Sequence, residues 1–215
     1  MSIKIYAKTL GMVQTNAYLV GDTETNEAVL IDPVDEAPTL VQTAKDAGWT
    51  IKLILATHAH FDHVLASQAL VNLTGAPFYI HEEAAPHLDN LPQTGVQFTG
   101  TPFPQAAKPD KLLSNDDVIE HGSIRLQSLY TPGHAPGHLS FYLESEGIVF
   151  SGDSLFAGTI GRTDLPGGSM STLMQSIEDQ LLPLPDETRV LPGHGTETSI
   201  GQERHTNPFI LNHLG

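Results

Sequence analysis

The 215-residue sequence predicts an α/β fold in which β-sheets are covered by helices on their outer faces. Short apolar runs bounded by Pro and Gly, which are typical of strands, alternate with segments whose apolar residues recur at helical spacing. In addition, four of the predicted strands end in His or Asp side chains. Open sheets commonly build functional sites at the carboxyl ends of their strands. We therefore expect a site at one sheet edge.

The first half of the chain begins with strands and then alternates helices with strands. The predicted elements are strands at Ile3–Ala7, Ala17–Val20 and Ala28–Ile31, a helix at 36–48, a strand at Ile51–Ala56, an amphipathic segment at Leu65–Leu73 and a short strand at Phe78–Ile80. Gly48 and Gly75 follow the two helical segments, and glycine at this position is a typical helix stop.

The second half contains one long segment without a regular pattern. Residues 89–112, rich in Pro, Gly, Gln and Thr, predict an irregular loop that forms a wall or lid of the site. Strand patterns resume over Val118–Tyr130 and at Leu139–Leu143, Ile148–Phe150 and Thr188–Leu191, and the segment 171–184 predicts a helix. Ser169 or Ser171 is expected to cap that helix.

The most informative segment is Thr57–His63, which directly follows the strand at Ile51–Ala56. It holds four side chains that are good ligands for divalent metals, namely His58, His60, Asp62 and His63. His and Asp are rarely buried without partners, which argues against packing residues. A solvated His-rich turn is the alternative. Donors this close together cannot all bind one small ion in good geometry, so the segment predicts two metal ions.

Three further strand ends repeat the pattern of a glycine followed by His or Asp. They are Pro132-Gly133-His134, Ser151-Gly152-Asp153 and Pro192-Gly193-His194. Glycine lets the backbone turn sharply and approach a ligand cluster closely. The recurrence disfavours the solvated turn. Seven donors suit two ions that share one carboxylate.

Several other polar residues have weaker signals. The remaining histidines, which we expect at the surface or behind the ligands, are His81, His87, His121, His138, His205 and His213. Asp32 also ends a strand; it could be a ligand, but we expect Asp32 and Thr57 to orient the imidazoles. Arg162 and Asp164 are expected to pair across a turn, and the alternative is that Arg162 attracts a substrate carboxylate.

Composition restricts the class of protein. The length and the 40% hydrophobic content predict a single domain over 1–215. A net charge of −15 with only ten Lys and Arg residues argues against nucleic acid as a partner. The lack of cysteine excludes disulfides, thiolate ligands and a Cys nucleophile. Met1–Tyr6 shows no signal-peptide pattern and no apolar run approaches membrane-spanning length, so we expect a cytoplasmic protein without a membrane partner. The oligomeric state is not predicted.

The ordered donors resemble those of the metallo-β-lactamase superfamily. The pattern His58-x-His60-x-Asp62-His63, then His134, Asp153 and His194, covers nearly the whole chain. The resemblance implies an αβ/βα four-layer sandwich with its metal site at the sheet edge. Two further segments, Thr15–Tyr18 and Gly161–Asp164, look like those of the short glyoxalase II-like hydrolases. The chain ends soon after His194, so the helical C-terminal domain that helps bind glutathione in full-length glyoxalase II is not expected.

The resemblance implies a ligand assignment. His58, His60 and His134 would hold a first metal ion, Asp62, His63 and His194 would hold a second, and Asp153 would bridge them. Zinc is favoured, with iron or manganese as alternatives. His63 favours the glyoxalase, lactonase and RNase Z groups over many true β-lactamases. His60 argues against the diiron flavoproteins, which use Glu there.

The implied reaction is hydrolysis of a small-molecule thioester by a hydroxide that bridges the metals, with Asp62 and Asp153 as the catalytic carboxylates. One alternative is a persulfide dioxygenase with a single iron held by His58, His134 and Asp153. Another is a lactone, ester or phosphodiester hydrolase of the same fold. A binding protein without activity is disfavoured because all seven donors are present. Metal identity and stoichiometry would separate the first two.

Overall fold

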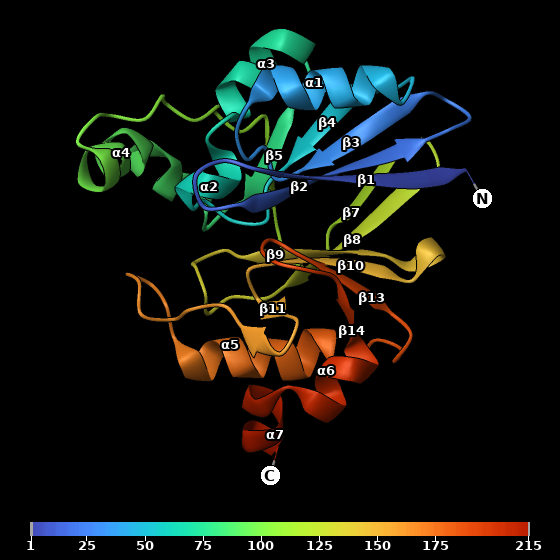
Figure 1. The fold of residues 1–215 in the computed structure, drawn as a ribbon, viewed down its shortest axis with the longest axis vertical. Coiled ribbons are helices and arrows are strands. Elements are labelled where there is room, and N and C mark those ends of the chain that lie inside the picture. The colour runs from blue at the N-terminus through green and yellow to red at the C-terminus, as the bar shows by residue number, and fades with distance from the viewer. Residues whose placement is uncertain (1, 215) are drawn as a thin grey trace. The chain divides into compact units, whose positions relative to one another are not determined.

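The computed structural model describes residues 2–214 (Figure 1). These residues form two compact units. The first unit runs to Leu113 and includes Glu120–Ile124, and the second comprises Ser114–Ile119 and the chain from Arg125 onward. The expectation of two sheets flanked by helices, and so of an α/β fold, is confirmed. That the whole chain is a single domain stays a prediction.

The first unit contains a six-stranded sheet in simple sequence order. Its strands are β1 (Ile3–Leu10), β2 (Thr15–Asp22), β3 (Glu27–Ile31), β4 (Thr50–Leu55), β5 (Phe78–His81) and β6 (Lys111–Leu113). β1 to β3 are antiparallel, and β3 to β6 are parallel. β1 and β2 form a long hairpin paired from Ile3 with Asp22 to Leu10 with Thr15, so both strands extend beyond their predicted ends. β6 was not predicted.

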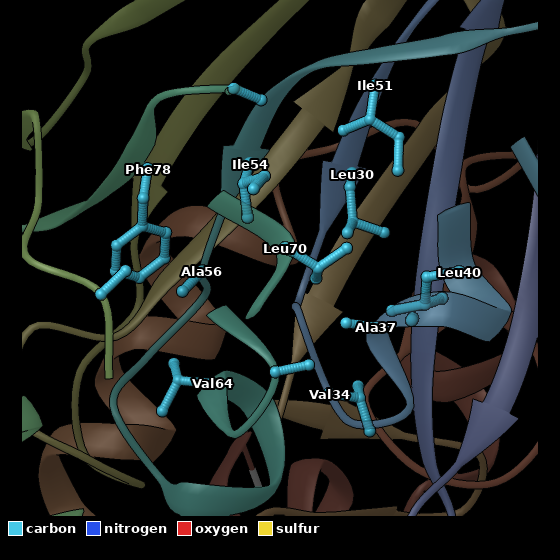
Figure 2. Packing of buried hydrophobic residues seen from close by; sticks show 14 of the residues in the cluster. Leu30, Val34, Ala37, Leu40, Ile51, Ile54, Ala56, Val64, Leu70 and Phe78 are labelled. Carbon is cyan, nitrogen blue, oxygen red and sulfur yellow. The ribbon is translucent and has the colours of Figure 1, made fainter. Parts of the chain in front are cut away.

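Helices pack on one face of this sheet. They are α1 (Ala37–Asp46) and α3 (Ser67–Thr74), with the short α2 (Phe61–Val64) preceding α3 (Figure 1). Leu40 from α1, Leu70 from α3 and Ile54 from β4 are fully buried against one another (Figure 2). Replacing such a residue by alanine typically costs about 2–5 kcal/mol. This core lies directly beneath the loop that carries the predicted ligands.

The prediction of an irregular loop over 89–112 was wrong for its first part. A 3₁₀-helix, η1 (Ala85–Asn90), leads into α4 (Leu91–Thr99). Pro92 lies in the first turn of α4, where its missing N–H is not needed. Gly100, with φ of 78°, ends the helix in the left-handed conformation. Pro and Gly here mark the ends of a helix and not its absence.

The other six-stranded sheet lies mostly in the second unit. Its strands are β7 (Val118–His121), β8 (Ile124–Tyr130), β9 (Leu139–Leu143), β10 (Ile148–Gly152), β13 (Arg189–Pro192) and β14 (Thr198–Ser199), in the order β14-β13-β10-β9-β8-β7. β10 and β13 are parallel, and β8, β9 and β10 are antiparallel. A 3₁₀ turn, η2 (Glu144–Glu146), joins β9 to β10, and a small hairpin of β11 (Leu155–Phe156) and β12 (Thr159–Ile160) follows β10.

The predicted helix over 171–184 is α5 (Met170–Ser176), which continues as a π-helical turn, η3 (Ile177–Leu181). Ser169 caps it by accepting a hydrogen bond from the Thr172 backbone N–H. Leu173 and Ile177 pack in one core cluster with Val190 of β13. α6 (Ile200–Thr206) and α7 (Pro208–Leu214) close the chain and were not predicted. Among residues 2–214, no helix has the length and apolar character needed to cross a membrane.

Candidate metal centre

The first unit places four of the predicted donors together just after β4. His58 and His63 are fully buried, whereas His60 and Asp62 are half-buried. Nε2 of His58 lies 3.0 Å from Nδ1 of His60, and Nε2 of His63 lies 3.4 Å from Oδ2 of Asp62. The short α2 begins within this run and brings the ring centroid of His63 to 4.1 Å from that of His58. The donors therefore face one another and do not point separately into solvent.

Asp32 fixes this loop from the end of the neighbouring strand β3. Its Oδ1 accepts the backbone N–H of Thr57 at 2.7 Å. Its Oδ2 accepts the Thr57 hydroxyl at 3.0 Å and Nδ1 of His63 at 2.8 Å. Asp32 is buried and has a φ of 58°, a left-handed conformation that Asp tolerates better than most residues. The carboxylate thus holds a backbone, a hydroxyl and an imidazole at once.

These contacts determine which ring nitrogens carry protons. The Thr57 hydroxyl gives its single proton to Asp32, so it accepts from Nδ1 of His58 at 2.9 Å. His63 donates its Nδ1 proton to the Asp32 carboxylate. In the neutral rings, Nε2 of both histidines is then unprotonated and presents a lone pair. This is the form in which an imidazole binds a divalent metal.

Thr15 orients the carboxylate of Asp62. Its hydroxyl donates to Oδ2 of Asp62 at 2.8 Å from the first position of β2, and Thr15 is fully buried. The neighbouring Asn16 accepts a hydrogen bond from Thr9 across the β1–β2 hairpin at 2.8 Å. The Thr15–Tyr18 segment, which the sequence singled out only by resemblance, therefore has a physical connection to a predicted ligand.

The second unit brings its three predicted donors together from three different strands. His134 follows β8, Asp153 follows β10 and His194 follows β13. Oδ2 of Asp153 lies 3.5 Å from Nε2 of His134 and 3.5 Å from Nε2 of His194. The ring of Phe156 packs edge-on against His194. The carboxylate that the sequence predicts as the shared ligand thus lies between two imidazoles.

Backbone groups hold these donors in place. Nδ1 of His134 donates to the carbonyl oxygen of Arg162 at 2.8 Å, which leaves its Nε2 unprotonated. The chain comes this close because residue 161 is glycine. A Cβ at Gly161 would lie 1.9 Å from the Asp153 carbonyl oxygen and 3.1 Å from Nδ1 of His134. Any side chain there would displace one ligand or the other.

His138 has a role that the sequence did not reveal. It is fully buried, and its Nε2 accepts the backbone N–H of Asp153 at 3.0 Å. Its Nδ1 contacts the Thr131 hydroxyl at 2.8 Å. His138 therefore positions the Asp153 backbone and does not face a metal with that nitrogen. Its position four residues after His134, across a Pro-Gly turn, was the only signal in the sequence.

The donor set fits divalent metal ions. In the second unit, the unprotonated Nε2 of His134 faces a carboxylate oxygen. Both atoms are electron-rich and repel each other, and a cation between them would remove this repulsion. In the first unit, Nε2 of His58 and Nε2 of His63 are prepared in the same way. His and Asp side chains in both units could therefore bind metal.

Comparison with known proteins agrees with this chemistry. A model of the metallo-beta-lactamase superfamily matches residues 10–194. The chain belongs to the metallo-β-lactamase superfamily. Among its relatives in this superfamily is the hydroxyacylglutathione hydrolase GloC of Haemophilus influenzae, 38% identical over 98% of each chain.

Two solved structures are also similar over nearly their full length. BLEG-1, described as a B3 metallo-beta-lactamase, has a TM-score of 0.90 at 40% identity and is covered to 99%, with 96% of this chain aligned. TTHA1623 in a di-iron-bound form has a TM-score of 0.86 at 42% identity and is also covered to 99%, with 95% of this chain aligned. The predicted superfamily is confirmed.

The other polar residues singled out in this metallo-β-lactamase domain make local contacts. Arg162 donates two hydrogen bonds to Asp164, at 2.7 and 2.8 Å, and both side chains are exposed. The contact holds the pKa of Asp164 at about 2 and raises the pKa of Arg162. His121 contacts Glu27 at 2.8 Å, and Nδ1 of His81 accepts the Glu83 N–H. His213 contacts Glu178 at 3.0 Å, and His87 and His205 lie at the surface.

Proposed function

We propose that the two donor sets form one dinuclear centre and that the protein hydrolyses a small thioester. The observation that supports the proposal is the tautomer in which three of the imidazoles are held. In His58, His63 and His134, a hydrogen bond fixes the proton on Nδ1 and leaves Nε2 as a donor. Surface histidines need no such arrangement. Membership of a superfamily whose relatives include a named hydrolase supports the same conclusion.

The ligand assignment implied by the resemblance is the one we propose. His58, His60 and His134 would hold one ion, Asp62, His63 and His194 the other, and Asp153 both. Zinc is the metal we favour, although the di-iron form of a 42% identical protein makes iron an alternative and supports two metal positions. Bound divalent ions would supply an activated water molecule and polarise the thioester carbonyl.

The residues of the chain contribute orientation and proton transfer. Asp32 and Thr57 keep the protons on Nδ1 of His63 and His58, so that both rings stay in their binding tautomer. Thr15 holds Oδ2 of Asp62, and we propose that Oδ1 of Asp62 takes the proton of the attacking water. Water adds to the acyl carbon and the C–S bond breaks, which yields a carboxylic acid and a thiol.

A thioester is favoured over other substrates on two grounds. The GloC relative, named for hydroxyacylglutathione hydrolysis, aligns with 98% of this chain. The motifs Thr15–Tyr18 and Gly161–Asp164, which look like those of glyoxalase II-like hydrolases, both contact predicted ligands: Thr15 bonds Asp62 and the Arg162 carbonyl bonds His134.

Metal content and hydrolysis of S-lactoylglutathione, measured on the same sample, test the proposal. We expect about two metal ions per chain and turnover that is lost in Asp62→Asn. His121→Ala, which removes a histidine paired with Glu27, serves as the matched control and should retain activity. One iron per chain, no hydrolysis and oxygen uptake with glutathione persulfide would instead establish the dioxygenase alternative.

A further inference from the structure

Three phenylalanine rings form an aromatic patch in the first unit. Phe61 comes from α2, Phe98 from α4, and Phe103 from the segment that follows α4. The ring centroid of Phe61 lies 5.1 Å from that of Phe98 and 5.3 Å from that of Phe103, at tilted angles typical of aromatic pairs. The Phe98 side chain is 64% exposed. An exposed aromatic group of this size commonly marks a binding surface.

The patch is rigidly supported. Phe61 and Phe103 are half-buried and pack on the main core cluster of the first unit. Phe103 passes against α4 at Gly95, where a Cβ would lie 2.2 Å from the Phe103 backbone nitrogen. The glycine within α4 therefore allows the close approach of Phe103, whose ring contacts that of Phe61. Such packing makes the outer faces of the rings a fixed surface.

Phe61 connects the patch to two predicted ligands along the chain. It stands between His60 and Asp62 and is the first residue of α2. The Phe61 backbone is thus bonded directly to both of these residues, and its ring contacts that of Phe98.

The charges of the protein's own side chains do not favour an anionic occupant. The chain has a net charge of −15. Arg162, the cation whose backbone contacts the His134 ligand, is already paired with Asp164 through two hydrogen bonds. Its charge is therefore compensated within its own loop. The residue that adjoins His60 and Asp62 in the chain is aromatic.

We propose that this aromatic patch binds an apolar acyl group of the thioester, and that Phe98 is a specificity-determining residue for it. The inference rests on the proposed function, because it assigns the substrate class of the same site. It implies that the enzyme acts on thioesters with extended alkyl or aromatic acyl groups more efficiently than on acetyl or lactoyl thioesters.

Two series of compounds test this inference. The first is a set of N-acetylcysteamine thioesters from acetyl to hexanoyl, compared by kcat/KM. The second is the matching set of S-alkyl thioethers, which cannot be hydrolysed, compared by Kd in calorimetry with the protein as isolated. In the wild type we expect a gain of up to about fourfold per added methylene in both series. Phe98→Ala should flatten both series, and Phe98→Leu should restore part of the gain.

Leu73→Ala is the matched control, because Leu73 is a 57% exposed apolar residue on α3 of the same unit. It should leave both chain-length series unchanged. If thioether binding improves with chain length but no thioester is hydrolysed, the proposed function is wrong, whereas the role of the patch in binding an apolar group is retained. The inference is wrong if the wild type binds all thioethers of the series with the same affinity, or if the variants at residue 98 show the same dependence on chain length as the wild type. This holds whether or not thioesters are hydrolysed.

Discussion

The two donor sets are held by different kinds of group. In the first unit, four donors come from one short run, and buried side chains position them: Asp32 and Thr57 bind His63 and His58, and Thr15 binds Asp62. In the second unit, three donors come from three strand ends, and a main-chain group takes part in each of the hydrogen bonds that position His134 and Asp153. The carbonyl of Arg162 binds His134, and the backbone N–H of Asp153 is held by His138.

This difference follows from how the chain reaches the two sets. A single run of residues has its donors fixed in sequence, so the remaining requirement is to orient side chains. Donors from separate strands require the strand ends themselves to approach, and glycines without Cβ atoms allow this. Substitutions in the two units should therefore act by different routes: loss of a side-chain partner in the first unit, and steric displacement of the backbone in the second.

The largest effect is expected from Gly161→Ala in the second unit. The new Cβ would lie 1.9 Å from the Asp153 carbonyl oxygen, so the loop or the ligand has to move. Overpacking of this kind costs about 1–3 kcal/mol of stability, and displaced ligand partners reduce metal affinity about 10–100-fold. Metal titration and thermal unfolding of the variant measure both effects.

Gly158→Ala is the control for that variant, since a Cβ there meets no atom within 4 Å. Gly158 has a φ of 73°, so alanine there lowers the stability only through this backbone conformation, by about 1 kcal/mol. We expect its metal affinity to match the wild type. Equal metal affinities in the two variants would show that backbone approach at Gly161 does not position the ligands.

A smaller effect is expected from Asp32→Asn in the first unit. Asparagine keeps the shape and tolerates the left-handed φ of 58°, so the backbone is preserved. It removes the charge that holds the Nδ1 proton of His63, and the Thr57 contacts have one acceptor fewer. We expect metal affinity to fall about tenfold with little change in fold, as judged by metal titration beside circular dichroism.

A second variant at this position, Asp32→Ala, tests whether side chains position the donors of the first unit. If side chains position the donors of the first unit, Asp32→Ala should be worse than Asp32→Asn, because it removes every acceptor. Indistinguishable metal affinities for wild type, Asp32→Asn and Asp32→Ala would contradict the proposed role of this carboxylate.

The sequence predicted that the candidate donors lie at strand ends, where the structure has them, because these signals are local. An apolar strand followed by Gly and then His or Asp needs no knowledge of distant contacts, and His134, Asp153 and His194 were identified in this way. The role of His138 was not predictable, since it depends on the Asp153 backbone fifteen residues away. Only the folded chain shows which nitrogen of a histidine faces which partner.

The error over 89–112 has a similar origin. Pro92 and Gly95 resemble breakers when they are counted as composition. In the structure, Pro92 lies where a helix accepts proline, and Gly95 makes room for Phe103. The structural effect of Gly or Pro therefore depends on its position along an element and on what packs against it. The contact between Gly95 and Phe103 leaves no periodic pattern in the sequence from which it could be predicted.

Side-chain anchoring in the first unit extends to a position away from the donors, where we expect a substitution to have the smallest effect on metal binding. Asp22, at the end of β2, is buried and accepts hydrogen bonds from the backbone N–H groups of Ser123 and Glu24. These hydrogen bonds, that of Ser123 foremost, lower the pKa of Asp22 from 3.8 to about 2. Because the folded-state pKa is depressed, the contribution is present above about pH 4 and is lost as the pH falls toward 2.

Asp22→Asn should therefore destabilise the protein by about 2 kcal/mol at pH 7, as follows from the lowered pKa of Asp22. The difference between wild type and variant should shrink as the pH falls from about 4 to about 2, because the wild-type carboxyl then becomes protonated as well. Urea denaturation of both proteins after metal removal measures this without interference from the ligands. If the difference in unfolding free energy stays constant over this pH range, Asp22 stabilises the β2 end by its shape alone. If the difference disappears, charged side chains anchor the first unit at positions other than its donors as well.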